Sequence, residues 1–350
     1  MKIIRHKTKV IKIGNVYIGG NNPIAIQSMA KTKTSDIQKT SKELKELENI
    51  GCEIVRVAVK DSADAKAISK LKNRINIPIV ADIHFNWRLA LEAIDNGADK
   101  IRLNPGNIYK KNEIREIVRA AKLAHIPIRV GVNSGSLRSR QSSAERMVES
   151  ALGYIKILEG FGFYDIVVSL KASNILDTIE AYRKIAKLCN YPLHLGVTAT
   201  GLPLQGAIKS SIALGVLLQE GIGDTIRISL TGKPQDEVKV AKSILETLGL
   251  RHFTPEIVSC PTCGRCEVDL IKIVRGLEEK LYAKRYTLNA IRPLKIAVMG
   301  CVVNGPGEAR EANIGVAFGR KAGLLFKDGK PLRKISAGKC VDVLLRELSH

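Results

Sequence analysis

Aromatic residues are scarce in this chain, and long apolar runs are missing from it. Only 4% of the residues are Phe, Trp or Tyr, so few platforms exist on which single-stranded nucleic acid could stack. The N-terminus carries no apolar run, and no uninterrupted apolar stretch reaches the length of about eighteen residues that a transmembrane helix needs. We therefore expect a cytoplasmic protein that has no membrane segment and binds no nucleic acid specifically.

Acidic residues are also in short supply. The chain has 34 Asp and Glu against 56 Lys and Arg, which gives a formal net charge of +22. A field of this sign attracts anionic substrates or an acidic protein partner. With 350 residues, 45% of them hydrophobic, the chain is long enough for two domains with sizeable cores.

One pattern recurs through the first 250 residues, a glycine followed by an apolar, β-branched run. It occurs in "NIGCEIVRVAV", "DNGADKIRLNP", "EGFGFYDIVVSL" and "EGIGDTIRISL". The glycine suits the end of a helix and the run suits a buried strand. Four further runs complete eight strands, expected to start near residues 24, 54, 77, 100, 127, 165, 193 and 225, with amphipathic helices between them.

Eight such units of roughly thirty residues predict an α/β protein with a (β/α)8 TIM-type barrel. A doubly wound sheet is the alternative, because periodicity does not show closure. The repeat ends near Leu250. We expect a barrel over residues 1–250 and a smaller α+β domain over residues 255–350.

Polar residues stand where the predicted strands end. Because the carboxyl ends of barrel strands form the site in such folds, these residues are candidate ligands for a substrate. Five cations there would be costly to bury without a partner, and an anionic substrate is a suitable one. A salt bridge to a neighbouring carboxylate is the ordinary alternative for any single arginine. The candidates are Arg56, Arg102, Asn104, Arg129, Asn133, Lys171, Arg227 and Ser229.

Two further candidates, Asp82 and His84, lie in "ADIHF" at the end of the third predicted strand. These side chains are expected to orient a substrate or to transfer protons. A histidine that is simply hydrogen-bonded in the core is the alternative for His84.

Three of the seven cysteines fall within "SCPTCGRC", residues 259–266. Closely spaced thiols in a reducing compartment are more often ligands than disulfide partners. Cys301 and Glu308, in "GCVVNGPGE", are expected to complete a site with Cys260 and Cys263. Spacing leaves both an iron–sulfur cluster and a structural zinc open, with Cys266 as a rival fourth ligand. The ligands for a closed zinc site are scarce, because no second CxxC pair lies outside this segment.

Six strings of residues, in this order, carry a resemblance to a known family: "RLNPGN", "RVGVNSGSL", "LHLGVT", "EGIGDTIRISL", "CPTCGR" and "MGCVVNGPGEARE". The chain resembles the 4-hydroxy-3-methylbut-2-enyl diphosphate synthases (IspG or GcpE family) of the non-mevalonate isoprenoid pathway. The likeness runs nearly end to end. It implies a substrate-binding barrel followed by a domain that carries a 4Fe-4S cluster.

The resemblance also implies an activity, ligands and partners. The reaction would be the two-electron reductive ring opening and dehydration of 2-C-methyl-D-erythritol 2,4-cyclodiphosphate. Electrons would come from reduced flavodoxin or ferredoxin, and the enzyme would be a homodimer. The family's cluster ligands match Cys260, Cys263, Cys301 and Glu308, which leaves Cys266 outside the set, and Asn304 belongs to the cluster-side motif. The family's diphosphate contacts match Arg56, Arg102, Arg129, Asn133, Lys171, Arg227 and Ser229.

One departure from the family pattern concerns Ala199, which stands where the family usually has a glutamate that faces the substrate. An alanine cannot transfer a proton, so another group or water must supply the acid. The nearby candidates are Thr198, Thr200, His84 and Asp82. Two rival hypotheses are a protein that binds the cyclodiphosphate without turning it over, and a non-catalytic basic barrel with a structural zinc that holds RNA or an anionic metabolite.

Overall fold

The computed structural model describes residues 3–136, 144–283 and 294–348. The chain divides into two compact units, Met1–Arg251 and His252–His350. Each unit has its own sheet and its own core, and each is described separately below.

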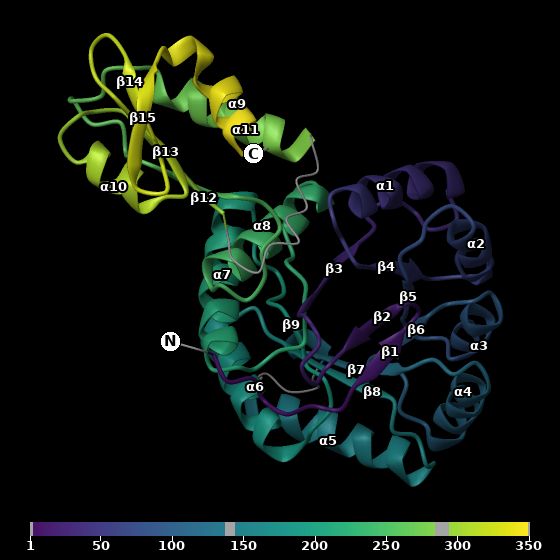
Figure 1. Ribbon diagram of the computed structural model, residues 1–350. Coiled ribbons are helices and arrows are strands. Elements are labelled where there is room, and N and C mark those ends of the chain that lie inside the picture. Colours follow the sequence, from purple (N-terminus) through teal and green to yellow (C-terminus); the bar gives the residue numbers. More distant parts are fainter. Residues whose placement is uncertain (1–2, 137–143, 284–293, 349–350) are drawn as a thin grey trace. The chain divides into compact units, whose positions relative to one another are not determined.

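Eight parallel strands form the sheet of the first unit, in the order β8-β7-β6-β5-β4-β3-β10-β9 (Figure 1). A bridge between Val168 and Leu193 joins β8 to β9, and the Val168 N–H donates to the carbonyl of Pro192 at 2.9 Å, so the ends of the sheet meet. The predicted (β/α)8 barrel is confirmed, and each strand starts within two residues of its expected position. The strands are β3 (Ala25–Met29), β4 (Ile54–Val59), β5 (Ile79–Ile83), β6 (Lys100–Leu103), β7 (Ile128–Asn133), β8 (Ile166–Lys171), β9 (His194–Leu195) and β10 (Thr225–Ile226).

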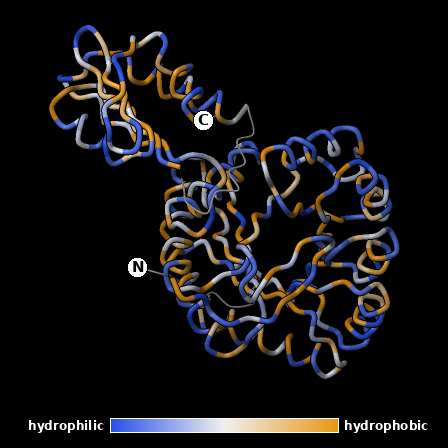
Figure 2. The backbone as a smooth tube through the Cα atoms, viewed as in Figure 1, coloured by the Kyte–Doolittle hydropathy of each residue, from blue (hydrophilic) through white to orange (hydrophobic). Residues whose placement is uncertain are grey.

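Eight helices follow the strands and surround the ring (Figure 1). In α1, the buried Leu44 and Leu47 lie on the face toward the sheet, while lysines and glutamates cover the other face, as the helical spacing predicts. Figure 2 shows this alternation of apolar and polar segments around the ring. The helices are α1 (Ile37–Asn49), α2 (Ser62–Lys72), α3 (Arg88–Asp95), α4 (Lys111–Leu123), α5 (Ala144–Gly160), α6 (Ile175–Leu188), α7 (Pro203–Gln219) and α8 (Pro234–Thr247).

An N-terminal hairpin that the sequence did not predict precedes the barrel, with strands β1 (Ile11–Ile13) and β2 (Val16–Ile18). Its buried isoleucines pack against the first inward residues of four barrel strands, which are Ala25, Ile54, Val80 and Val167. These residues lie near the amino ends of their strands, so the hairpin seals that end of the barrel. A ligand must therefore reach the interior from the carboxyl ends.

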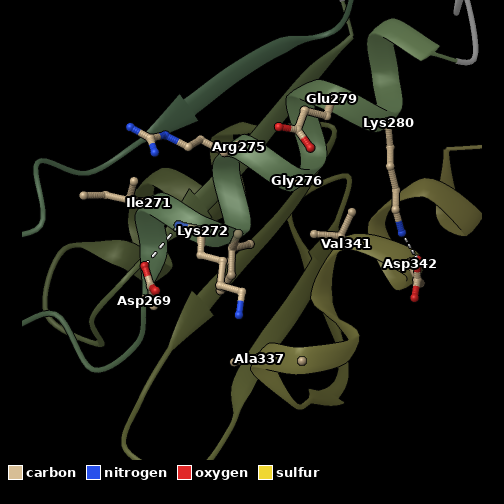
Figure 3. A pocket seen from close by; sticks show the side chains of 12 residues that line it. Asp269, Ile271, Lys272, Arg275, Gly276, Glu279, Lys280, Ala337, Val341 and Asp342 are labelled. Carbon is tan, nitrogen blue, oxygen red and sulfur yellow. Dashed lines mark hydrogen bonds and ion pairs between the residues drawn. The ribbon is translucent and has the colours of Figure 1, made fainter.

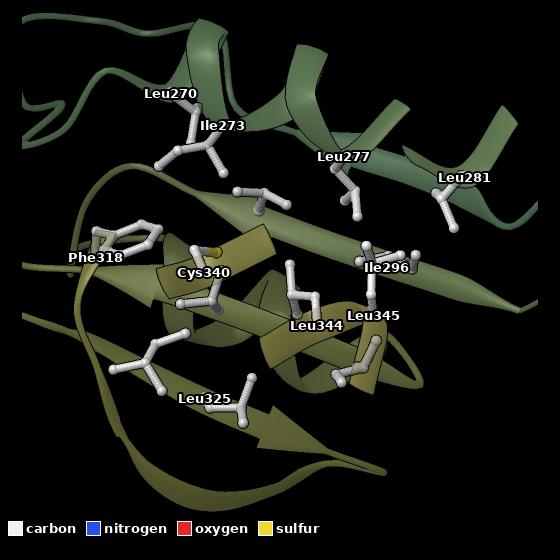
Figure 4. Close-up of a cluster of buried hydrophobic side chains, with 14 residues drawn as sticks. Leu270, Ile273, Leu277, Leu281, Ile296, Phe318, Leu325, Cys340, Leu344 and Leu345 are labelled. Carbon is white, nitrogen blue, oxygen red and sulfur yellow. The ribbon is translucent and has the colours of Figure 1, made fainter. Parts of the chain in front are cut away.

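The second unit is a three-layer α/β/α arrangement around a five-stranded mixed sheet, ordered β11-β12-β13-β14-β15. Alternate residues of β12 point to opposite faces. Ile296 and Val298 belong to the cluster that packs against α9 and α11 (Figure 4), whereas Ala297 and Met299 pack against α10. The elements are β11 (Glu256–Ser259), α9 (Leu270–Ala283), β12 (Lys295–Met299), α10 (Gly305–Glu311), β13 (Ile314–Phe318), β14 (Gly323–Lys327), β15 (Lys330–Ile335) and α11 (Cys340–Glu347).

Candidate active site

The barrel interior changes from apolar to polar in the layer of side chains that follows the hairpin contacts, toward the carboxyl ends of the strands. Side chains two residues apart on a strand point to the same face. Because Ile54 and Val80 pack against the hairpin inside the barrel, Arg56 and Asp82 also point inward, one level nearer the carboxyl ends. The strand register then sets Asp82 beside Arg102, and Arg102 beside Arg129. Residues from four neighbouring strands are thus brought together, as the sequence predicted for their positions at strand ends.

Asp82 holds two of these arginines. Its carboxylate lies 3.1 Å from Nη1 of Arg102 and 3.7 Å from Nε of Arg56, and all three side chains are largely buried. Burial by itself would raise the pKa of Asp82, but Arg56, Arg102 and Arg129 together lower it to about 2. Asp82 is therefore ionised at neutral pH, and this geometry suits it to orient arginines rather than to donate a proton.

Arg129 and Lys100 are buried cations that form no direct ion pair with any described carboxylate, although Asp82 lies within electrostatic range of Arg129. Arg129 is 1% exposed and Lys100 is 0% exposed. Among the residues that the structure describes, Nζ of Lys100 and both Nε and Nη1 of Arg129 have no hydrogen-bond partner. Burial and the neighbouring cations hold the pKa of both groups well below the usual values. Such groups are costly in an empty protein and favourable beside an anion.

Sequence reasoning missed Lys100, because a lysine that opens a strand is usually exposed. The one available signal is its inward alternation with Arg102 in "KIRL".

Arg227 is oriented by a carboxylate that the sequence did not single out, Glu237 of α8. Nη2 of Arg227 lies 3.5 Å from this carboxylate, which also accepts hydrogen bonds from Ser28 (3.1 Å) and from the backbone of Leu230 (3.1 Å). Glu237 is 1% exposed, and Lys31 forms a second ion pair with it at 3.1 Å. The carboxylate thereby ties α8 to the ends of β3 and β10.

The remaining predicted barrel residues lie at or just beyond the carboxyl ends of their strands. Lys171 ends β8, and its Nζ lies 3.2 Å from Nε2 of His194, a residue that the sequence reasoning also passed over. The side chain of Asn104 accepts a hydrogen bond from Gly106 at 3.1 Å and so shapes the turn after β6. Asn133 ends β7, and Ser229 follows β10. His84 follows β5 and is half-buried.

The position of Ala199 is conformationally unusual. Its φ is +53°, in the left-handed region, within the loop between β9 and α7, and its side chain is exposed. The neighbouring Thr200 is buried and donates its hydroxyl hydrogen to the carbonyl of Ser229. Of the four candidate acids, Thr200 is thus engaged in a structural hydrogen bond and Asp82 is ionised, which leaves His84 and Thr198.

In the second unit, the parallel pairing of β11 with β12 brings the two cysteine loops together. Ser259 pairs with Val298, so Cys260 and Gly300 leave the sheet side by side. The Gly300 N–H donates to Sγ of Cys260 at 3.3 Å. A Cβ atom on Gly300 would lie 2.3 Å from Sγ of Cys266 and 3.6 Å from Sγ of Cys260. Glycine at this position therefore makes room for two sulfur atoms.

The surroundings of the other two thiols, Cys301 and Cys263, favour the thiolate form. Backbone N–H groups of Val303, Asn304 and Gly305, at the start of α10, lower the pKa of Cys301. Hydrogen bonds with Arg265 lower the pKa of Cys263, which is exposed.

The remaining cluster-side candidates are exposed, and they do not complete a metal site by themselves. Asn304 caps α10, where its carbonyl accepts from the N–H of Glu308 at 3.3 Å, and the side chain of Glu308 is exposed. The described part of the chain contains no group of three His, Cys, Asp or Glu side chains that is already arranged to hold a metal ion.

A separate groove runs between α9 and α11, with an ion pair between Lys280 and Asp342 (2.6 Å) at one end (Figure 3). Its lining includes none of the predicted site residues. Within the described residues, no helix has the length and apolarity required to cross a bilayer.

Together these features define the class of protein: a (β/α)8 barrel with a cationic interior, joined to a smaller unit that displays clustered thiols. Two family models match the chain, the GcpE TIM-barrel domain over residues 8–242 and the GcpE protein C-terminal domain over residues 256–350. The chain belongs to the GcpE family.

Relatives match over nearly the whole length. A protein of Caldanaerobacter subterraneus subsp. tengcongensis is 52% identical, over 99% of this chain and 97% of its own, and one of Fusobacterium nucleatum is 49% identical, over 99% and 98%. Both are named 4-hydroxy-3-methylbut-2-en-1-yl diphosphate synthase (flavodoxin). The dihydropteroate synthase structure from Stenotrophomonas maltophilia has a TM-score of 0.54 at 12% identity, over 69% of this chain and 98% of its own. This last likeness shows the barrel fold alone.

We expect the Asp82→Asn substitution to destabilise the barrel by on the order of 2 kcal/mol at neutral pH, because Asp82 has a folded-state pKa of about 2 against 3.8 for an ordinary aspartate carboxyl. A depressed pKa gives stability that is present above the unfolded value and is lost as the pH falls through the folded one. The difference between parent and variant should therefore shrink from pH 4 to pH 2. Urea unfolding at several pH values measures it.

The matched control is Glu116→Gln, which changes an exposed carboxylate on α4 and should leave the free energy of unfolding unchanged. A difference between Asp82→Asn and the parent that stays constant down to pH 2 would contradict the assigned ion pairs.

Proposed function

We propose that this chain is a 4-hydroxy-3-methylbut-2-en-1-yl diphosphate synthase. It opens the ring of 2-C-methyl-D-erythritol 2,4-cyclodiphosphate and releases one oxygen as water, with uptake of two electrons and two protons. Family membership over the whole chain supports this reaction. The alternative of a non-catalytic barrel with a structural zinc has no support among the relatives, which are named as synthases.

The charge balance of the barrel interior is the observation that carries the proposal. Two buried carboxylates, Asp82 and Glu237, are set against six cations among the described inward-facing residues. A dianionic diphosphate would supply the missing negative charge. It would also accept hydrogen bonds from the N–H groups of Arg129 and Lys100 that have no partner among the described residues. The six cations are Arg56, Lys100, Arg102, Arg129, Lys171 and Arg227.

The other predicted contacts suit the same ligand. Asn133 and Ser229 stand at the carboxyl ends of β7 and β10, where they would hydrogen-bond phosphate or hydroxyl oxygens. Asn104 would act by shaping the loop after β6.

The thiol loops of the second unit fit an iron–sulfur cluster. Its ligands would be Cys260, Cys263, Cys301 and Glu308, because the first three offer sulfur atoms from two adjacent loops and Glu308 lies one helical turn beyond the second loop. When bound, a 4Fe-4S cluster would supply single electrons to the substrate. The exposed side chains of Cys263 and Glu308 would become ordered on binding, and Asn304 would hold the start of α10.

Protons must come from the chain or from water. His84 lies just beyond the carboxyl end of β5, and an imidazole is the side chain that most often serves as a general acid. We assign the proton donor to His84, and the orientation of Arg56 and Arg102 to Asp82.

The proposed partners follow from charge and exposed surface. Reduced flavodoxin or ferredoxin, both acidic, would dock on a chain of net charge +22 in the cytoplasm. A homodimer is supported by an apolar stripe on α7, where Leu204, Ile208 and Ile212 are spaced four residues apart and are 69%, 52% and 52% exposed. A second copy of the chain would cover this stripe.

Anaerobic reconstitution should give a brown protein that turns over the cyclodiphosphate with a chemical reductant. Cys301→Ser should abolish turnover, because it removes a cluster ligand, whereas Cys189→Ser, outside the second unit, should keep it. Arg129→Ala should weaken substrate binding about tenfold or more and leave the iron content unchanged. A colourless protein with one zinc per chain, or turnover by Cys301→Ser, would sink the proposal.

Gly300→Ala tests the sulfur site without removing a ligand. The added Cβ would collide with Sγ of Cys266 at 2.3 Å and would approach that of Cys260, so we expect iron content after reconstitution to fall severalfold. Gly264→Ala, in the same loop but with nothing within 4 Å of the new atom, is the matched control. Iron and sulfide analysis measures both variants, and equal loading would show that the loops do not hold the cluster this way.

Ile208→Glu tests the dimer. A charge in the middle of the α7 stripe should convert a dimer into monomers in sedimentation velocity, because it would be buried unpaired. Leu123→Glu, which alters an isolated exposed leucine on α4, should leave the dimer intact. A dimer that survives Ile208→Glu would place the interface elsewhere.

A further inference from the structure

Lys171 differs from the other inward cations in the kind of partner it has. Arg56 and Arg102 share the carboxylate of Asp82, and Arg227 has that of Glu237. Lys171, which is 6% exposed, is instead hydrogen-bonded to an imidazole: its Nζ lies 3.2 Å from Nε2 of His194.

The other ring nitrogen of His194 is also engaged, at 2.7 Å from Oγ1 of Thr225 on the next strand. A lysine ammonium can only donate, so Nε2 of His194 must be the acceptor. The ring proton then sits on Nδ1 and is donated to Thr225. Burial and the surrounding cations, Lys171 first among them, keep the pKa of His194 well below its usual value, so the ring is neutral. Thr225 thereby fixes one tautomer, which presents a lone pair to Lys171.

The residue after β9, Gly196, also provides the space that Lys171 occupies. A Cβ atom on Gly196 would lie 2.6 Å from Nζ and 3.0 Å from Cε of Lys171, so no other residue fits there without moving the lysine. Tyr182 fixes the separation of the two strands, since its hydroxyl accepts from the N–H of Leu170 (3.1 Å) and donates to the carbonyl of His194 at 2.5 Å. The acceptor on His194, the space at Gly196 and the clamp formed by the two hydrogen bonds of Tyr182 together define one position for the lysine head group.

We propose that His194 is a positioning residue that aims the Lys171 ammonium at a bound phosphate. A neutral acceptor holds the head group without cancelling its charge, whereas a carboxylate would form a closed ion pair. Two of the three N–H bonds of Lys171 thus stay available for an anion. The identity of that anion as the cyclodiphosphate rests on the proposed function. The anion seat itself, which we define as the Lys171 ammonium held by His194, Thr225 and Gly196, does not.

The seat has a pH signature. Lys171 faces Arg227, Arg56, Arg129 and Arg102, and burial with this repulsion lowers its pKa. The hydrogen bond to neutral His194 opposes that shift, because it favours the charged amine. Anion affinity that depends on the ammonium is lost as the pH rises through its pKa. Removing the acceptor should therefore move this loss to lower pH.

The test is calorimetric titration of the full chain with inorganic pyrophosphate and with the cyclodiphosphate from pH 6 to pH 10. We expect His194→Leu to weaken pyrophosphate binding about tenfold and to lose it at lower pH than the parent. His194→Gln, whose amide can both accept and donate, should bind nearly as the parent does. Tyr182→Phe, which loosens the clamp but keeps the acceptor, should leave the pH dependence unchanged.

Parent-like binding by His194→Leu at every pH would overturn the proposal, and so would equal weakening by the Gln and Leu variants. If His194→Leu does not fold, Thr225→Val frees the ring to change tautomer and should weaken binding severalfold, and parent-like binding by it would count against the proposal. A parent that shows the pyrophosphate pattern but does not bind the cyclodiphosphate would contradict the proposed function and leave the seat standing.

Discussion

Burying positive charge without an equal negative charge is the constraint on which this structure depends. A cation taken from water into a protein interior loses hydration that only a partner can replace. The barrel meets part of that cost with Asp82 and Glu237, and among the described residues it leaves N–H groups of Arg129 and Lys100 without a hydrogen-bond partner. An interior of this kind is least stable when empty, so a polyanionic ligand contributes affinity that no apolar pocket could give.

The fold limits the cost of the buried cations by confining them to one part of the barrel interior. Apolar residues and the β1–β2 hairpin close the amino end of the barrel, so the cations lie beyond this apolar layer, toward the carboxyl ends of the strands. Carboxylates and the neutral His194 set the directions of individual head groups while the net charge stays positive. The second unit follows the same logic with sulfur: two parallel strands end side by side, and a glycine between them leaves room for thiols.

Sequence reasoning recovered what periodicity and strand position encode. The eight strands and the arginines at their ends were predictable, because a buried strand tolerates few cations without a function. The residues that surround these arginines were not predictable. Glu237 lies on a helix, His194 has the pattern of a core residue, and Lys100 is the first residue of a strand, where a lysine is usually exposed. The hairpin was missed because strands of three residues carry almost no periodic signal. Which side chains meet across a barrel depends on register, and register is not visible in one sequence.

The central claim is that unbalanced positive charge inside the barrel binds the diphosphate of the substrate. A crystal structure of the complex with 2-C-methyl-D-erythritol 2,4-cyclodiphosphate tests it most directly. The account predicts phosphate oxygens within hydrogen-bond distance of the guanidinium of Arg129 and the ammonium of Lys171. A cyclodiphosphate bound outside the barrel, with these two head groups still lacking an anion, would contradict it.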